Sequence, residues 1–290
     1  MKTTVCRALL IAMLAVVSAL VQGCSQIGQN VPEPPPKHST HELPHDNVQR
    51  PDPLPFGDPS NAAADPADLN NLLVRHRSHV LSYNNSRGTL NWAAWFTTKA
   101  DLGERLERPM FKPDTSLPNG AKRIQYYDYS GSGYDRGHIV PSADRFADPE
   151  LNAETFLMTN IVPQTSSLNQ YPWNKLEVYA RSLARSGNTL YTIAGVYGEQ
   201  ERLKNRVTVP TNCWKVIAVF RGGAIQFDTR TRVIAVDMPN IAGLEDADWK
   251  QYITTVDEIE KRTGLDLFSN VPKELQERLE SRPYAALKSR

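Results

Sequence analysis

The chain has 290 residues, and 33 Lys and Arg residues against 32 Asp and Glu residues give it a formal net charge of +1. The length allows one large domain or two small ones, and the composition, with 40% hydrophobic residues, excludes collagen-like, coiled-coil and globally disordered chains. Three cysteines are too few for a disulfide-dense scaffold. The near-zero charge argues against a nucleic-acid partner, unless the sum hides two oppositely charged parts of the chain.

Residues 1–23 have the pattern of a secretory signal peptide. A basic start precedes an apolar run over residues 8–21, which is too short to cross a bilayer. The run ends in Val-Gln-Gly-Cys, which resembles a bacterial lipobox with an imperfect Gln22. We therefore expect export, either as an envelope lipoprotein attached to the membrane through a lipidated Cys24 or by plain secretion. A buried core helix or a short membrane anchor is the alternative.

Residues 24–70 are predicted to form a disordered, proline-rich tether. Within them, residues 31–66 hold 10 of the 21 prolines and show no apolar period. Three histidines of this stretch, His38, His41 and His45, have no cysteine or carboxylate arrangement that would complete a metal site. We expect them to belong to a solvated tail.

Residues 71–284 have the texture of one folded domain. The segments rich in aromatic and β-branched residues, which predict strands, are 92–96, 123–127, 189–197, 214–220 and 231–236. One helix is predicted over residues 173–186 from its apolar stripe. Another is predicted between a capping-box pattern at Thr255 and Glu258 and a stop at Gly264. Strands dominate, so we expect a single mixed α+β domain.

The motifs that the domain lacks exclude several kinds of site. After His79 it contains one histidine, His138, and one cysteine, Cys213, so no Cys/His zinc cluster can form there. It has no Gly-x-Ser-x-Gly elbow, no phosphate-binding Gly-x-x-x-x-Gly-Lys loop and no dinucleotide-binding Gly-x-Gly-x-x-Gly. Cys213 lies in an apolar run and is expected to be a small buried hydrophobic residue.

His138 ends the sequence Asp135-Arg136-Gly137-His138. The aspartate offers an acceptor that could orient the imidazole, the arginine offers a fixed cation for an anionic substrate, and the histidine offers a base near neutral pH. On its own the tetrapeptide could equally be an ordinary polar turn with a satisfied histidine.

A second segment, 30 to 40 residues further along, favours a catalytic interpretation. Glu177 lies on the apolar stripe of its predicted helix, where an unpaired carboxylate would be unfavourable, and a hydrated cation would satisfy it. Asn169 lies just before this helix, and a neutral amide oxygen with waters suits Mg²⁺. Asn169 alone would be interpreted as a helix cap or turn. Together with His138, the set predicts a one-metal phosphodiester site.

The ordered motifs closely resemble those of the DNA/RNA non-specific endonuclease family, the ββα-metal nucleases that include mitochondrial endonuclease G and secreted bacterial sugar-non-specific nucleases. The matching segments are 129–134, 135–138, 159–164, 168–177 and 256–264. The resemblance covers residues 71–282 and implies a central antiparallel β-sheet flanked by helices, with a ββα-metal active-site motif.

The resemblance also implies the roles of the residues. His138 would be the general base that activates water, Asn169 would be the direct protein ligand of Mg²⁺, with Mn²⁺ as a substitute, and Glu177 would hold a water of the hydrated ion. Substrates would be DNA and RNA, cleaved to 5′-phosphate and 3′-hydroxyl products. Because the reacting group is the phosphate, little sequence selectivity is expected.

The remaining roles fall to polar residues around this centre. Arg136 would contact phosphate, and Asn160 would help to fix the loop. An arginine upstream of the signature would stabilise charge in the transition state; Arg108 is our choice and Arg105 the alternative. Members of the family are often homodimers, and a toxin role would require an inhibitor protein as a partner.

Two other classes of function remain as alternatives. One is a surface nucleic-acid-binding lipoprotein on a decayed nuclease scaffold, and the other is a periplasmic serine hydrolase. The distribution of charge no longer opposes a nucleic-acid partner, because residues 175–232 contain 10 basic and 4 acidic residues while residues 1–70 are acidic.

Overall fold

The computed structural model describes residues 51–223 and 225–284, which belong to one compact unit. The predicted signal peptide, Cys24 and most of the predicted tether lie outside these residues. Among the helices of the described part, none is long and apolar enough to cross a bilayer.

A seven-stranded antiparallel sheet forms the centre of the fold, in the order β1-β2-β3-β6-β9-β10-β11. Its strands are β1 (Leu72–Arg75), β2 (Val80–Asn84), β3 (Thr89–Thr97), β6 (Thr189–Tyr197), β9 (Asn212–Phe220), β10 (Arg232–Pro239) and β11 (Ile253–Thr254). The long strands β6 and β9 pair along their whole length, from Thr189 opposite Phe220 to Tyr197 opposite Asn212. Both consist mostly of β-branched, aromatic and small apolar residues, which suit a sheet covered on both faces.

Side chains that alternate along each strand build two separate cores. In β3, Ala93 and Trp95 belong to one hydrophobic cluster, whereas Trp92, Ala94 and Phe96 belong to the other. This is the period of two that a pleated strand imposes. The sheet is therefore buried on both faces.

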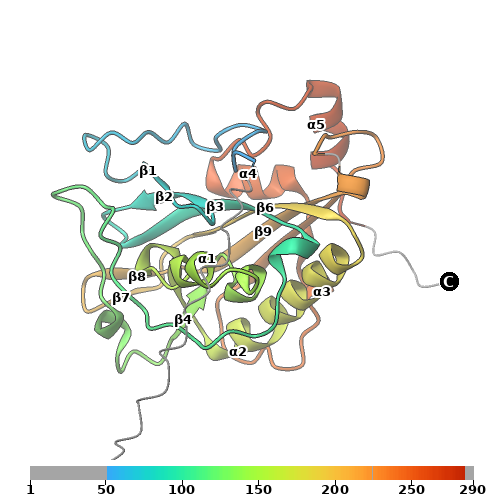
Figure 1. The fold of residues 1–290 in the computed structure, drawn as a ribbon. Helices are drawn as coiled ribbons and strands as arrows, with labels where there is room; N and C mark the ends of the chain where they lie inside the picture. The colour runs from blue at the N-terminus through green and yellow to red at the C-terminus, as the bar shows by residue number, and fades with distance from the viewer. Residues whose placement is uncertain (1–50, 224, 285–290) are drawn as a thin grey trace, which may run out of the picture. The chain divides into compact units, whose positions relative to one another are not determined.

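Helices from different parts of the chain cover the two faces (Figure 1). The first core receives Leu176 and Ala184 of α3 (Asn174–Arg185). The second core receives Ile259 of α4 (Val256–Thr263) and Leu279 of α5 (Lys273–Glu280). The molecule is thus layered as helix, sheet and helix. We call the two sides the α3 face and the α4/α5 face.

The α3 face carries a small antiparallel pair of strands followed by a helix. Strands β4 (Asp135–His138) and β5 (Ile161–Gln164) pair with His138 opposite Ile161. The chain then passes through α2 (Ser166–Leu168) and a π-helical turn, η5 (Asn169–Trp173), into α3. The remaining elements are the short helix α1 (Pro149–Glu154) and a two-stranded ribbon of β7 (Glu201–Leu203) and β8 (Val207–Val209). The predicted α+β fold, with a central antiparallel sheet, flanking helices and a ββα motif, is confirmed.

The helix predicted between Thr255 and Gly264 is confirmed as α4, because the residues that begin and end it are close to it in the sequence. Thr255 caps α4 by accepting a hydrogen bond from Glu258 N at 3.1 Å, and Gly264 ends the helix with a φ of 75°. That left-handed conformation favours glycine. The helix predicted over residues 173–186 corresponds to α3.

The strand predicted over residues 123–127 is wrong. Residues Tyr126–Tyr129 form a short 3₁₀ helix instead. The carboxylate of Asp128 folds back and accepts a hydrogen bond from Gln125 N at 2.8 Å, and Arg206 holds the same carboxylate at 3.1 Å. Side-chain capping therefore outweighs the β-propensity of the aromatic residues.

The segment that precedes β1 packs on the domain, so the tether predicted over residues 24–70 does not reach residue 70. The ring of Phe56 lies in the second core, with its centroid 4.6 Å from that of Phe227. Ser60 accepts a hydrogen bond from the Trp92 indole at 2.8 Å. A high proline content marked this segment as extended, but Phe56, Leu54 and Ala62 pack on the second core and fix the segment against the sheet.

Candidate active site

A cleft of about 610 Å³ opens on the α3 face of the sheet. Its lining residues are Arg105, Leu106, Arg108, His138, Pro141, Ser142, Ala143, Phe146, Phe156, Asn169, Gln170, Asn174, Glu177 and Arg181. It brings together residues that lie up to 76 positions apart in the chain. Among the described residues, this cleft is where most of the predicted site residues meet.

Four of the six predicted site residues line the cleft: His138, Asn169, Glu177 and Arg108. The other two, Arg136 and Asn160, do not line it. The alternative arginine, Arg105, lines it as well.

His138 projects from the end of β4 and is held by aromatic rings. Its ring centroid lies 4.7 Å from that of Phe156 and 5.5 Å from that of Phe111. No described residue makes a hydrogen bond to the imidazole, and Nε2 is buried. Burial lowers the pKa of His138, and the positive charge of Arg108 adds to this effect, so that the pKa falls to about 3. The imidazole is therefore neutral at physiological pH and able to accept a proton.

Asp135 does not orient the imidazole, contrary to one interpretation of the Asp-Arg-Gly-His sequence. It points away from His138, because the side chains of adjacent strand residues alternate and three positions place the two on opposite faces of β4. Its carboxylate instead accepts hydrogen bonds from Asn169 Nδ2 at 2.9 Å, Gln170 Nε2 at 3.0 Å and Ser166 Oγ at 2.9 Å. Burial raises the pKa of Asp135, but these hydrogen bonds outweigh it, so the net pKa is lowered.

The hydrogen bond to Asp135 fixes the amide of Asn169. With Nδ2 engaged, Oδ1 remains without a donor among the described residues. Asn169 begins the π-helical turn, which includes Pro172. Proline cannot continue an ordinary α-helical hydrogen-bond pattern, and turns of this kind are frequent at functional sites. An oriented, unpaired amide oxygen is a suitable ligand for a hard cation such as Mg²⁺.

Glu177 has protein partners that the sequence did not reveal. Its carboxylate accepts a hydrogen bond from Lys215 Nζ at 3.1 Å, and Arg181 lies 3.9 Å away. Arg181 also pairs with Asp144 at 3.2 Å. Burial raises the pKa of Glu177, while Lys215 and Arg181 act in the opposite direction. Two carboxylates and two cations thus balance in this cluster, so the burial of Glu177 does not by itself require a metal ion.

Lys215, like Arg181, is a partner of Glu177 that the sequence analysis missed. Its side chain is 2% exposed, and its ammonium group lies 4.1 Å from the centroid of the Trp173 ring. A signal was present, because Lys215 is a single charge in the apolar strand segment Trp-Lys-Val-Ile-Ala-Val-Phe. A lone charge in a buried strand needs a partner. That partner, Glu177, lies 38 positions earlier.

Asn160 is fully buried and positions the segment after His138. Its Oδ1 accepts a hydrogen bond from Val140 N at 2.9 Å, and its Nδ2 donates to Val140 O at 3.0 Å and Thr155 O at 2.8 Å. Three hydrogen bonds satisfy the amide almost completely. Asn160 therefore acts on the cleft through the backbone.

Gly137 allows β4 and β5 to approach closely. A Cβ atom at this position would lie 2.0 Å from Gln164 Oε1, which is far inside van der Waals contact. Gln164 in turn donates to Cys213 Sγ at 3.4 Å, so the strand pair packs directly on β9.

Of the three candidate arginines, Arg108 and Arg105 line the cleft and Arg136 does not. The Arg136 guanidinium donates to Tyr126 O at 2.7 Å and lies 5.7 Å from the centroid of the Phe111 ring. The Arg108 guanidinium lies 5.3 Å from the same centroid and 5.8 Å from that of Phe156, and Arg108 lines the cleft. Arg108 also perturbs the pKa of His138, whereas Arg105 does not. The geometry therefore favours Arg108 over Arg105 as the cation beside the base.

The arrangement contains the parts that phosphodiester hydrolysis needs. A neutral imidazole supplies a base, an oriented amide oxygen with a nearby carboxylate supplies donors for a hydrated hard cation, and an arginine supplies positive charge next to them. All of these groups face one cleft.

Comparison with known sequences agrees with this chemistry. A family model described as DNA/RNA non-specific endonuclease matches residues 59–274. A nuclease of Nostoc sp. is 42% identical over 276 residues, which cover 93% of this chain and 96% of the relative. A nuclease of Serratia marcescens is 33% identical, with 73% and 80% coverage, and human mitochondrial endonuclease G is 32% identical, with 69% and 70% coverage.

Comparison with solved structures supports the fold. A crystal structure of the EndoG/EndoGI complex contains a chain that matches with a TM-score of 0.64 and 24% identity. The match covers 77% of this chain and 92% of that chain.

Proposed function

The chain belongs to the DNA/RNA non-specific endonuclease family, and on that premise we propose that it is an exported, Mg²⁺-dependent endonuclease that hydrolyses DNA and RNA with little sequence selectivity. The observation that carries the proposal is the convergence of His138, Asn169 Oδ1 and Glu177 on one cleft, with His138 held neutral. We further propose 5′-phosphate and 3′-hydroxyl products.

His138 is the proposed general base. Its lowered pKa keeps the imidazole unprotonated at the pH of the reaction, so it can take a proton from the attacking water. The rings of Phe111 and Phe156 restrict its orientation and exclude water from its buried edge. Arg108, beside it in the cleft, offsets the negative charge that grows on the phosphate.

Asn169 and Glu177 are the proposed residues for the ion. Asn169 would bind it through Oδ1, and Glu177 would accept hydrogen bonds from its hydrating waters. When bound, Mg²⁺ supplies positive charge that offsets charge on the phosphate and on the leaving 3′ oxygen, and Mn²⁺ could replace it. The Asp135 carboxylate keeps the Asn169 amide in the required orientation, and Lys215 does the same for Glu177.

Arg136 and Asn160 have supporting roles in this proposal. Arg136, which is partly exposed beside the cleft, contacts a phosphate of the bound strand. Asn160 positions the backbone that carries His138. Phosphate contacts hold a nucleic acid without reading its bases, which is consistent with low sequence selectivity.

Export is proposed from the signal sequence over residues 1–23. The two routes are attachment to the membrane through a lipidated Cys24 and plain secretion, and the mass of the mature N-terminus distinguishes them. A homodimer is the proposed assembly. An inhibitor protein is a further proposed partner, motivated by the EndoG/EndoGI complex.

The test is hydrolysis of plasmid DNA and of RNA by the purified protein, with Mg²⁺ and with EDTA. We expect the wild type to cleave both substrates only with Mg²⁺, and His138→Ala to be slower by about 10²–10⁴-fold, the contribution of a general base. Lys261→Ala is the matched control, because Lys261 is an exposed charge on α4, and it should keep the wild-type rate.

Circular dichroism must show that His138→Ala is folded. A wild-type rate in this variant would overturn the assignment of the base. Binding of both nucleic acids without any hydrolysis by the wild type would instead support a binding protein on a nuclease scaffold.

A further inference from the structure

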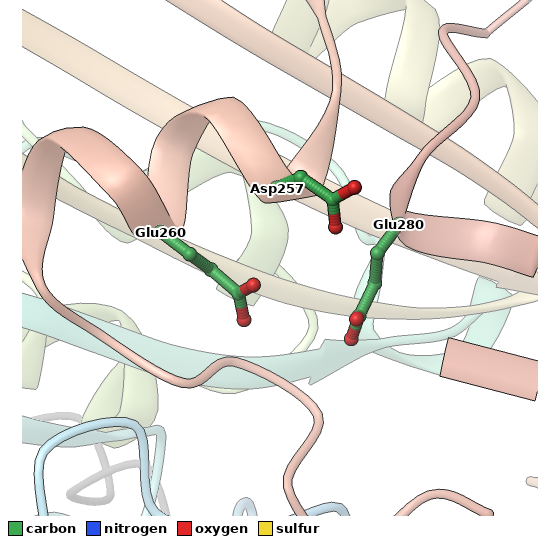
Figure 2. A group of neighbouring side chains, drawn as sticks. All are labelled: Asp257, Glu260 and Glu280. Carbon is green, nitrogen blue, oxygen red and sulfur yellow. The ribbon is translucent and has the colours of Figure 1, made fainter. Parts of the chain in front are cut away.

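Three carboxylates converge on the α4/α5 face, far from the cleft in the fold. Asp257 and Glu260 lie one turn apart on α4, and Glu280 is the last residue of α5. One oxygen from each lies within 4.8 Å of the others. Figure 2 shows the three side chains extending from the two helices toward a common space.

Glu280 has no partner in this cluster. The residue is 7% exposed, and its Oε1 is buried without a hydrogen bond. Buried carboxylate oxygens are normally paired, so an orphaned one that faces two other carboxylates needs an explanation. Glu280 also stands at the C-terminal end of a helix, where the helix dipole disfavours negative charge.

The described residues supply no positive charge that would neutralise the cluster. The two basic residues of α4 are engaged elsewhere: Lys261 pairs with Glu258, and Arg262 pairs with Asp237 and Glu258. Burial raises the pKa of Glu280 to about 8, and the groups that raise it further are Glu260, Asp257 and Asp266. All three are acids.

The donor set selects the kind of ion. Carboxylate oxygens without histidine or cysteine favour a hard cation such as Ca²⁺ or Mg²⁺. Ligand oxygens on opposite sides of Ca²⁺ lie roughly 5 Å apart, twice the Ca²⁺–oxygen distance, whereas those around Mg²⁺ lie about 4 Å apart at most. Oxygens within 4.8 Å of one another are compatible with the larger ion without rearrangement of the helices.

We propose that Asp257, Glu260 and Glu280 bind a divalent cation, Ca²⁺ in preference to Mg²⁺, and that this ion links α4 to α5. Water molecules would complete the 6 to 8 oxygen ligands that Ca²⁺ takes. One carboxylate oxygen of Glu260, Oε1, already accepts a hydrogen bond from Leu267 N at 2.7 Å, which restricts the orientation of this side chain. The site is structural, and it does not depend on the proposed nuclease activity.

The test is the melting temperature of the purified protein at pH 8, in EDTA and with increasing CaCl₂. A ligand that binds the folded state stabilises it in proportion to the logarithm of its concentration, so we expect wild type to gain about 3–8 °C at ten to a hundred times the dissociation constant. MgCl₂ should give a smaller gain at equal concentration.

Two variants locate the ion. Glu280→Gln and Glu260→Gln should each lose the Ca²⁺-dependent gain in melting temperature. The use of two variants guards against a folding defect in either one. Asn169→Ala, in which the cleft lacks its amide ligand, should keep the gain. The proposal is overturned if wild type shows no gain, or if Glu280→Gln gains as much as wild type. A gain that disappears only in Asn169→Ala would place the ion in the cleft, and that also overturns it.

Discussion

The two faces of the sheet treat buried acidic groups in opposite ways. On the α3 face, Glu177 lies between Lys215 and Arg181, and Arg181 also pairs with Asp144. On the α4/α5 face, Glu280 meets only other acids.

The comparison shows that a carboxylate in the interior needs an external cation only when the protein supplies no positive side chain beside it. Glu177 is also largely enclosed, with 12% of its side chain exposed, yet its charge is balanced by side chains of the same chain. Removal of a protein cation should therefore destabilise the first cluster, whereas removal of a negative charge should stabilise the second when no metal ion is present. Substitutions in the two clusters should therefore change the free energy of unfolding in opposite directions.

The largest effect is expected from Lys215→Met. This change leaves Glu177 buried without its main partner, which should lower the free energy of unfolding by about 3–5 kcal/mol. Denaturant titration measures the loss. The double variant Lys215→Met/Glu177→Gln should recover most of it, because the remaining amide carries no charge. A loss below about 1 kcal/mol in the single variant would show that Lys215 does not balance Glu177.

A smaller effect of the opposite sign is expected from Glu280→Gln in EDTA. Burial raises the pKa of Glu280 to about 8 in the folded protein, above its ordinary value of 4.5, so Glu280 binds its proton more tightly in the folded than in the unfolded chain. The resulting contribution to the free energy of unfolding is fully present below pH 4.5. This stability is lost as the pH rises through about 8. At pH 8 the variant should be more stable than wild type by about 2 kcal/mol, allowing for relaxation and water around the ionised group.

The pH dependence of unfolding distinguishes this charge effect from better packing. The difference between Glu280→Gln and wild type should be small near pH 4.5 and should grow toward pH 8. A difference that is constant with pH would contradict an uncompensated charge.

The smallest effect concerns Arg108, the cation beside the proposed base. Arg108 lowers the pKa of His138, so Arg108→Ala should raise that pKa and move the acid limb of kcat/KM to higher pH, by about half to one pH unit. Arg108→Lys keeps the positive charge and should leave the limb near its wild-type position. Rates measured across pH at constant ionic strength provide the comparison, and an unmoved limb in Arg108→Ala would rule out this coupling.

The sequence could predict those features whose causes are local. The strand over residues 189–197 and the ends of α4 followed from residue type and capping within a few positions. The candidate site residues His138, Asn169 and Glu177 were chosen from residue type, their places relative to one predicted helix and the family resemblance, and the fold brings them to one cleft.

Features that depend on distant partners were not predictable in this way. The strand expected over residues 123–127 is lost to Asp128, which is held by Arg206 from another part of the chain. Glu177 was recognised as a buried charge, but nothing near it in the sequence indicated Lys215. Asp135 serves Asn169 and not His138, and this depends on which side of β4 each residue faces.

The contact between Gln164 and Cys213 provides a way to detect opening of the β4–β5 strand pair. Cys213 is fully buried in β9, its thiol pKa is raised to about 12, and the only described neighbour that donates to its sulfur is Gln164 of β5. Such a thiol is inert toward alkylating reagents while the β4–β5 pair is seated on the sheet. Cys213 is therefore a native chemical reporter, whose labelling rate measures how often the strand pair that carries His138 opens.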